Sequence, residues 1–562
     1  MLRSVDGKWM MALAIICLLV PFSGKAYHID DPLFVWSAEH IQKAPFDFYG
    51  FEINWNGTPN PAHHIIQNPP LTGYVLALPS MLFGPGEFAL HLAMIFPAVI
   101  FALGVFRLAQ VYSAGPELSV LAALAAPAFL VSATSVMADV LLSALYVWSA
   151  VLWIEGLQQP KTWKMALSGV LASMAALTKY FGLSLVPLLL VHSLASKTRR
   201  PRLLLYLLIP LAMVAAYQAI TLHLYGRDLV REALFFTSEW QIDRNWAPVR
   251  QTIVGLAFVG GGLMSAVFFA PFIFSKRSLL LGIGCGAACL LGLFFLLTTG
   301  VIPIPNWDRL PAAVQFQFVL FWAVGVYILL VAVVELSQHR NGLTLTLFLW
   351  IIGTFVFVVY VNWTINARAL LPMLPAVAVI FARRANRSSR DGYGVRPSVI
   401  FAMGLGVCLA VAVAWGDHQL ARSQRDFSMD LEKKLSGYPN TIWFQGHWGF
   451  QYYMEAIGAH PMNFSGMVLK AGDVVVVPDN NTLTTRLPKQ DYRLLHTIQI
   501  PVNAPVSTMN NSVGAGFYSS VWGILPFVFH PVPAETYRIY LAGWQDNNHV
   551  AILQSLLSQN SP

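Results

Sequence analysis

Runs of apolar residues long enough to cross a lipid bilayer recur from the N-terminus to about residue 415 of this 562-residue chain. A helix needs about 20 mostly apolar residues to span the hydrocarbon core. The composition agrees, because 56% of the residues are hydrophobic and 11% are charged, whereas soluble domains carry about 25% charged residues. A soluble fold would expose apolar patches that aggregate. The sequence therefore predicts an α-helical polytopic membrane protein.

The apolar pattern predicts about thirteen transmembrane helices. They cover residues 9–24, 87–111, 117–134, 138–156, 165–178, 180–196, 203–222, 252–274, 278–300, 315–336, 343–361, 366–382 and 397–415. The pair 165–178 and 180–196 is the weakest, because its first member is short and Lys179 separates the two. No small-residue cleavage site follows the first run, so we interpret that run as a retained span rather than a signal peptide.

Basic residues gather in alternate loops of this pattern. The loops 157–164, 197–202, 275–277, 337–342 and 383–396 are rich in Lys and Arg and carry almost no acidic residues. Short loops of this kind are cytoplasmic. The pattern therefore predicts a multi-pass protein of the inner (plasma) membrane, with a cytoplasmic N-terminus and an external C-terminal part. It also accounts for the net charge of +8, so we expect no nucleic-acid partner.

The composition changes near residue 415 from long apolar runs to a polar, mixed sequence, and this change divides the chain into two regions. Residues 1–415 form the predicted transmembrane domain, with a long outer loop at 25–86 whose short apolar stretch 73–83 is expected to lie at the membrane interface. Residues 416–562 form a predicted small soluble α/β domain on the outer, periplasmic or extracellular, side. Its expected helices cover 417–435 and 449–457, and its expected strands cover 441–445, 474–477, 492–500 and 537–541.

Two adjacent carboxylates, Asp30 and Asp31, follow the first span at the predicted lipid–water boundary. A carboxylate at this position can accept a proton from an acceptor hydroxyl, or hold a divalent cation. The pair also fits a solvated helix N-cap, since Asp before an apolar run is a common helix start. The two residues alone do not decide between these interpretations.

The same outer loop carries His63, His64 and Asn68, and Asn68 precedes two prolines that favour a helix start. These side chains could offer hydrogen-bond donors or metal ligands, although a histidine pair in a solvated loop is usually not a metal site. Further along, three glycines at 260–262 lie within a span, where they indicate close helix packing rather than phosphate binding.

Three further charged residues stand at the ends of predicted spans. Asp139 begins the span 138–156, Lys179 separates two apolar runs, and Arg368 lies at the start of the span 366–382. An acid at a span entrance is either an N-cap or part of a site that faces the bundle. The two cations could either extend harmlessly to the interface or neutralise a phosphate at the bilayer surface.

In their order along the chain, these motifs resemble the GT-C superfamily of membrane glycosyltransferases. The resemblance is to the family 39-like branch of protein O-mannosyltransferases and lipid A aminoarabinose transferases. It rests on Asp30-Asp31, 68–74 (NPPLTGY), 82–84 (LFG), 87–92 (EFALHL), Asp139, 177–180 (LTKY) and 366–375 (NARALLPMLP). It covers residues 1 to about 415. The C-terminal region resembles the family only in its position after the transmembrane helices.

The resemblance implies sugar transfer from a polyprenyl-phosphate donor to a lipid, glycan or protein acceptor at the outer face of the membrane, with inversion. It assigns Asp30 the role of catalytic base and Asp31 a contact with acceptor or metal, so a divalent cation held by the two is compatible with it but not required. Lys179 and Arg368 would clamp the leaving phosphate, and Asp139 would be a positioning residue near Asp30. Either a hexosyl or a pentosyl group fits this reaction.

Two departures from the family pattern concern the cations near the donor. Asn68 stands where a His or Lys usually precedes the proline pair, and no basic residue follows shortly after the acidic pair. Lys179 and Arg368, helped by His63 or His64, would then supply more of the positive charge at the phosphate.

Two other classes of protein remain compatible with the sequence. A transporter or lipid flippase would also need many spans, but it would place ionisable groups near the bilayer midplane. A receptor or scaffold could work through the C-terminal region, where the aromatic stretch 443–453 either stacks on sugar or packs in a core. The charged residues at one face favour the enzyme.

Overall fold

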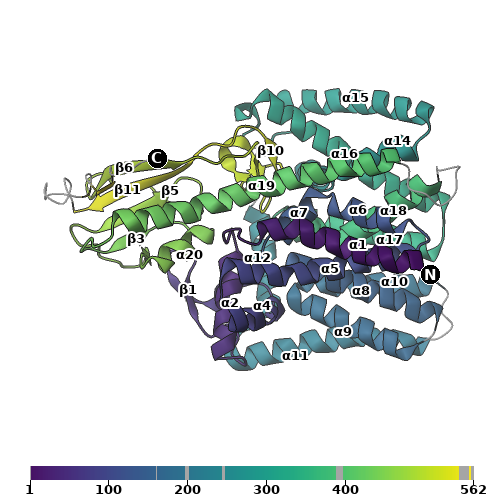
Figure 1. Ribbon diagram of the computed structural model, residues 1–562, viewed down its shortest axis with the longest axis horizontal. Coiled ribbons are helices and arrows are strands. Elements are labelled where there is room, and N and C mark those ends of the chain that lie inside the picture. The colour runs from purple at the N-terminus through teal and green to yellow at the C-terminus, as the bar shows by residue number, and fades with distance from the viewer. Residues whose placement is uncertain are drawn as a thin grey trace.

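The computed structural model describes residues 2–159, 161–196, 201–243, 247–304, 306–387 and 397–543, together with Leu553, Leu556 and Leu557. Residues 197–200 and 388–396, which belong to two predicted cytoplasmic loops, lie outside the described residues, as does most of the chain after 543. Figure 1 shows helices running side by side in one bundle, with strands gathered beyond one end and the N-terminus at the other end.

Except for α12 (Leu229–Asp243), which lies between the predicted spans 203–222 and 252–274, the helices of the bundle occupy the predicted apolar segments. They are α1 (Leu2–Leu19), α5 (Glu87–Val111), α6 (Pro116–Leu124), α7 (Pro127–Ala133), α8 (Asp139–Gln158), α9 (Thr162–Thr178), α10 (Leu185–Ala195), α11 (Leu208–Tyr225), α12 (Leu229–Asp243), α13 (Pro248–Gly262), α14 (Ala270–Ile273), α15 (Lys276–Thr298), α16 (Ala312–Gln338), α17 (Gly342–Val356), α18 (Leu374–Arg387) and α19 (Pro397–Lys434). The fold class, a polytopic helical membrane protein with a C-terminal region that contains strands, is thereby confirmed.

Within the described residues, eight helices are long and apolar enough to cross a membrane, or up to ten if each bent helix pair forms one span. The first bent pair is α6 and α7, which meet at 71° where Pro127 begins a new helix. The second is α13 with the segment Met264–Ile273, bent by 70°. The count of thirteen spans stays a prediction, because segments such as α9 and the stretch Tyr180–Ala195 are helical but short for a bilayer.

The outer loop that follows α1 is folded against the end of the bundle. It contains α2 (Asp31–Lys43), a two-stranded sheet of β1 (Glu52–Asn54) and β2 (Pro59–Pro61), α3 (Ala62–Ile65) and α4 (Leu71–Phe83). The last residues of α4, Leu82 and Phe83, expose 60% and 75% of their surface. Such exposed apolar side chains suit the predicted interfacial position of 73–83.

The glycine run in α13 packs directly against α16, as its sequence indicated. A Cβ atom on Gly260 would lie 1.7 Å from the carbonyl oxygen of Phe321, and one on Gly325 would lie 2.0 Å from that of Leu256. Only glycine allows two backbones to approach so closely.

The strands form a five-stranded sheet in the C-terminal region, with the order β4-β3-β5-β11-β6. These strands are β3 (Ile442–Phe444), β4 (His460–Pro461), β5 (Val474–Pro478), β6 (Tyr492–Ile500) and β11 (Glu535–Ala542). β3 pairs in parallel with β4 and β5, whereas β11 pairs antiparallel with β5 and β6. α20 (Trp448–Ala456) and the end of α19 pack on this sheet. Each predicted strand and helix of this region has its counterpart in the structure.

The predicted boundary at 415/416 falls inside a continuous helix, because α19 runs from the bundle into the sheet region (Figure 1). A second connection is the segment from β7 (Val506–Ser507) through β8 (Met509–Asn510) and β9 (Ala515–Gly516) to β10 (Val528–Phe529), hereafter the 506–529 segment. Its Phe517 and Phe527 belong to the same hydrophobic core as the bundle helices. The C-terminal region is therefore partly built into the end of the bundle.

Candidate active site

Four charged side chains from distant parts of the chain meet at the end of the bundle that faces the sheet region. Lys179 Nζ lies 2.6 Å from Asp139 Oδ1, and Arg368 Nη2 lies 3.1 Å from Asp30 Oδ2. Arg368 Nη1 lies 3.8 Å from Asp139 Oδ2 and links the two pairs. The structure thus places two of the three acids singled out in the sequence, Asp30 and Asp139, in one cluster with the two cations, hereafter the acid–cation cluster.

Local structure explains why two of these charges meet. α8 and α9 form an antiparallel helical hairpin, so Asp139, the first residue of α8, lies beside Lys179, the residue that follows α9. Each charge also has the favourable sign for its helix end, since the helix dipole stabilises an acid at the start and a cation at the end.

Asp30 occupies the N-cap position of α2, but its carboxylate makes no capping hydrogen bond to the backbone of that helix. It pairs with Arg368 instead. The N-cap interpretation therefore describes the position of Asp30 along the chain but not the partner of its side chain.

The cluster is open on one side. The Asp30 side chain exposes 35% of its surface and that of Lys179 exposes 23%, whereas Arg368 and Asp139 expose 9% and 3%. Two polar atoms on the covered side, Asp139 Oδ2 and Arg368 Nε, have no hydrogen-bond partner. A ligand that enters from the open side would meet one carboxylate and one ammonium group first, with a guanidinium behind them.

Asp31 has a different environment from Asp30. It is fully buried, and its two carboxylate oxygens accept hydrogen bonds from the backbone N–H groups of His28 and Val136 at 2.9 and 3.1 Å. Burial raises the pKa of the Asp31 carboxyl to about 7. Here Asp31 ties the outer loop to the turn before α8, and a contact with acceptor or metal stays a prediction.

His63, His64 and Asn68 lie apart from the acid–cation cluster. The ring of His63 stacks on Tyr225, with 4.6 Å between ring centroids, and His64 contacts Arg227. The carbonyl of Asn68 accepts a hydrogen bond from the Tyr49 hydroxyl. In the described part of the chain, no contact links these three residues to the cluster, so their predicted role at the donor phosphate stays a prediction.

The described residues contain no group of three or more His, Cys, Asp or Glu side chains placed to hold a metal ion. Asp30 and Asp31, the predicted ligands of an optional divalent cation, use their oxygens for Arg368 and for backbone N–H groups respectively. The arrangement as it stands offers cations, rather than a carboxylate cage, to a negatively charged ligand.

A second buried polar cluster, which the sequence did not reveal, lies behind the first. Lys25 Nζ lies 2.6 Å from Asp417 Oδ2, and neither side chain is exposed. Asp417 also accepts hydrogen bonds from the hydroxyl groups of Thr508 and Tyr518, both at 2.7 Å. His28 completes the group, with Nε2 3.8 Å from Asp417 Oδ1, and burial lowers its pKa to about 4.

These residues gave only a weak signal in the sequence. Lys25 is a lone cation just after the first apolar run, and Asp417 opens the polar continuation of the last one. Their contact joins positions 392 residues apart, and no local pattern predicts such a pairing.

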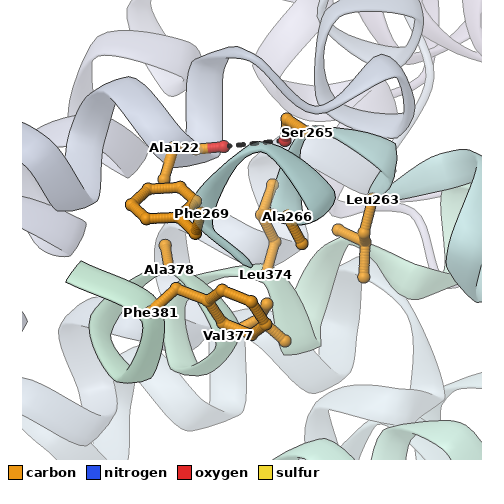
Figure 2. Close-up of a pocket in the computed structure, with 9 residues that line it drawn as sticks. All are labelled: Ala122, Leu263, Ser265, Ala266, Phe269, Leu374, Val377, Ala378 and Phe381. Carbon is orange, nitrogen blue, oxygen red and sulfur yellow. Dashed lines mark hydrogen bonds between the residues drawn. The ribbon is translucent and has the colours of Figure 1, made fainter. Parts of the chain in front are cut away.

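An apolar pocket opens between α6, the bend after α13 and α18 (Figure 2). Its lining residues are Ala122, Leu263, Ser265, Ala266, Phe269, Leu374, Val377, Ala378 and Phe381. Its one hydroxyl, that of Ser265, is directed at the carbonyl of Ala122 at 3.5 Å (Figure 2). With no titratable group in its lining, this pocket cannot carry the chemistry that the acid–cation cluster offers.

Residues 67–223 match the family described as dolichyl-phosphate-mannose-protein mannosyltransferase. The matched range contains Asn68, Asp139 and Lys179, and it leaves Asp30 and Arg368 outside. Over this part of the chain, the match confirms the resemblance inferred from the sequence motifs. No curated protein sequence matches the chain.

Several solved membrane glycosyltransferases are similar in structure at low identity. The archaeal oligosaccharyltransferase AglB from Archaeoglobus fulgidus, in complex with an inhibitory peptide and a dolichol-phosphate, shares 14% identity at a TM-score of 0.45, over 82% of this chain. ArnT from Cupriavidus metallidurans bound to undecaprenyl phosphate shares 14% sequence identity with this chain at a TM-score of 0.43. The similarity covers 84% of this chain and 92% of ArnT. The mycobacterial arabinofuranosyltransferase AftD shares 12% sequence identity with this chain at a TM-score of 0.44. The similarity covers 96% of this chain and 40% of AftD. The present chain spans 64% of the length of AglB.

Proposed function

We propose that this chain is an integral membrane glycosyltransferase that moves a hexosyl or pentosyl group from a polyprenyl-phosphate-linked donor to a lipid, glycan or protein acceptor at the outer face of the membrane. The observation that carries the proposal is the acid–cation cluster of Asp30, Asp139, Lys179 and Arg368. The family match over residues 67–223 supports a donor of the polyprenyl-phosphate type.

The reaction is one in-line displacement at the anomeric carbon. The acceptor hydroxyl oxygen forms the new bond to that carbon, while the bond between the carbon and the phosphate oxygen breaks and its electron pair leaves with the polyprenyl phosphate. The acceptor proton passes to a carboxylate, which we assign to Asp30, the most exposed acid of the cluster. A single displacement of this kind inverts the anomeric configuration.

Lys179 and Arg368 stabilise the phosphate as its negative charge grows. A guanidinium offers two parallel N–H groups to phosphate oxygens, and an ammonium adds a compact charge. Both cations are paired with carboxylates in this structure. When donor phosphate replaces Asp30 as the partner of Arg368 Nη2, the freed carboxylate becomes a better base, so donor binding and base activation are coupled.

Asp139 acts on the two cations rather than on the substrate. It is nearly fully buried, it accepts a hydrogen bond from Lys179, and its second oxygen faces Arg368. This contact holds the two cations side by side with their outer surfaces free for phosphate. We therefore assign Asp139 a positioning role.

The sidedness of the protein is part of the proposal. α8 carries Asp139 at its first turn and Glu155 near its other end, where Glu155 pairs with Arg107 and Lys164 at 2.5 Å. At the end of α16, the buried Glu335 likewise contacts Arg383, Arg384 and Arg387 of α18. Basic residues at the end of the bundle opposite the cluster support a cytoplasmic position for that end. The cluster and the sheet region would then be external, in an inner (plasma) membrane.

The position of the cluster favours the enzyme over a transporter. Asp30, Asp139, Lys179 and Arg368 all stand at helix ends at one face of the bundle. A transporter or flippase instead needs polar groups along a path near the midplane.

One experiment separates these two functions. The purified protein is incubated in detergent with a radiolabelled polyprenyl-phosphate sugar and an extract of membrane lipids, glycans and proteins. In parallel, it is reconstituted into sealed vesicles that contain the same donor. We expect label on an acceptor together with an equal amount of free polyprenyl phosphate. Movement of intact donor across the vesicle membrane, without sugar transfer in detergent, would instead establish the flippase.

A further inference from the structure

The 506–529 segment reaches the acid–cation cluster through backbone contacts with the stretch before Arg368. The N–H of Ala367 donates to the carbonyl of Phe517 at 2.9 Å, and the N–H of Ser520 donates to the carbonyl of Ile365 at 2.8 Å. These two bonds lie on either side of Tyr518, and they hold it next to Arg368.

Tyr518 covers one face of the Arg368 guanidinium. The guanidinium carbon lies 5.1 Å from the centroid of the Tyr518 ring. A planar cation over an aromatic face is attracted by the negative charge density of the ring, and its plane is restricted by the contact. Arg368 Nε has no hydrogen-bond partner, so the guanidinium is held by the ring over its face and by the contacts of its two Nη atoms.

Tyr518 is itself fixed from behind. It exposes 2% of its surface, and its hydroxyl donates to Asp417 Oδ2 at 2.7 Å. The same carboxylate accepts from Lys25 and Thr508. His28 packs edge-on against the ring, with 5.5 Å between ring centroids. The orientation of the ring is therefore set by a buried network that includes the outer loop, α19 and the 506–529 segment.

We infer that Tyr518 is a positioning residue for the proposed sugar transfer: it holds the Arg368 guanidinium in the orientation that receives the donor phosphate. The inference rests on the proposed function and deepens it, because it assigns to the C-terminal region a part in the geometry of the site. A shift of the guanidinium away from the phosphate would slow the transfer step, since the cation acts most strongly on the charge that develops there.

Three substitutions separate the ring from the hydroxyl and from the packing of the segment. Tyr518→Leu removes the ring over Arg368, and Tyr518→Phe keeps the ring but removes the hydrogen bond to Asp417. Phe517→Leu is the matched control, because Phe517 is a fully buried neighbour in the same segment and its ring packs edge-on against Tyr518, so this variant reports the effect of altered packing. Thermal unfolding of each variant in detergent reports whether the fold is intact.

We expect Tyr518→Leu to lower kcat about 10-fold or more with a change in the donor KM of about 3-fold or less, while Phe517→Leu stays within about 3-fold of wild type. The kcat of Tyr518→Phe should lie between those of Tyr518→Leu and Phe517→Leu. In an Arg368→Lys background, Tyr518→Leu should add about 3-fold or less, because the planar group that the ring positions is already gone.

Equal activities for Tyr518→Leu and Phe517→Leu, or full additivity with Arg368→Lys, would overturn the inference. Failure of the wild-type protein to transfer sugar would instead overturn the proposed function. In that case the same pair of substitutions is measured as affinity for a polyprenyl phosphate, for which non-additivity is again the expected result.

Discussion

Replacing Asp30 by asparagine is expected to lower the rate of sugar transfer by about 10²–10⁴-fold, which is the usual contribution of a positioned general base. The amide has nearly the same shape as the carboxylate, so the loop and the contact with Arg368 should persist. The amide oxygen, however, cannot accept the proton of the acceptor hydroxyl. The measurement is kcat for transfer of labelled sugar by the purified variant.

Glu52→Gln is the matched control for this substitution, because Glu52 is an exposed carboxylate of the same outer loop. It should transfer sugar at the wild-type rate. If Asp30→Asn does so as well, Asp30 is not the base, and another group must accept the proton.

Replacing Asp417 by leucine is expected to lower the free energy of unfolding by about 3–5 kcal/mol, the usual effect of removing one partner from a buried ion pair. Lys25 would be left as a fully buried ammonium group, and Thr134 Oγ1, 3.3 Å away, would be its one remaining acceptor among the residues that the structure describes. The hydroxyl groups of Thr508 and Tyr518 would lose their acceptor at the same time. The measurement is the unfolding temperature in detergent at a fixed scan rate.

The double variant with Lys25→Met and Asp417→Leu tests the cause of this loss. With both charges gone, no ion is left unpaired in the interior, so much of the stability should return. A single variant as stable as wild type, or a double variant as unstable as the single one, would show that the pair does not hold the outer loop to α19.

The sequence predicted those parts of the molecule that depend on local pattern. Helix α5 begins and ends at the predicted residues 87 and 111, because an apolar run of spanning length needs no tertiary partner to be recognised. The strands at 474–477 and 537–541 were equally visible as short β-branched or alternating runs between turn residues. Asp139 and Lys179 were singled out at the ends of neighbouring spans, whereas their pairing with each other is a finding of the structure.

Bends and long-range pairings could not be predicted in the same way. The apolar pattern predicts one span over 117–134, whereas Pro127 starts a second helix at 71° to the first. His63, His64 and Asn68 share the outer loop with Asp30, but their contacts are with Tyr225, Arg227 and Tyr49, because packing rather than sequence distance sets proximity in a folded loop. Their role at the donor phosphate stays a prediction.

The part of the site contributed by the C-terminal region had no sequence signal. Tyr518 lies 150 positions after Arg368 in a stretch of short strands and turns, and its ring reaches the cluster only because the 506–529 segment returns to the bundle. A domain boundary at residue 415, drawn from composition alone, puts Arg368 and Tyr518 in different domains although the two side chains are in contact.

The most direct test of the account compares two lysines of the α8–α9 hairpin in their effect on binding of a polyprenyl monophosphate. Lys179 pairs with Asp139 at the end where the acid–cation cluster lies, and Lys164 pairs with Glu155 at the opposite end. We predict that Lys179→Met weakens binding about 10-fold or more, the loss of one charged contact to phosphate, while Lys164→Met leaves it unchanged. Equal affinities for the two variants would contradict the claim that acids and cations from distant segments form one phosphate-binding site.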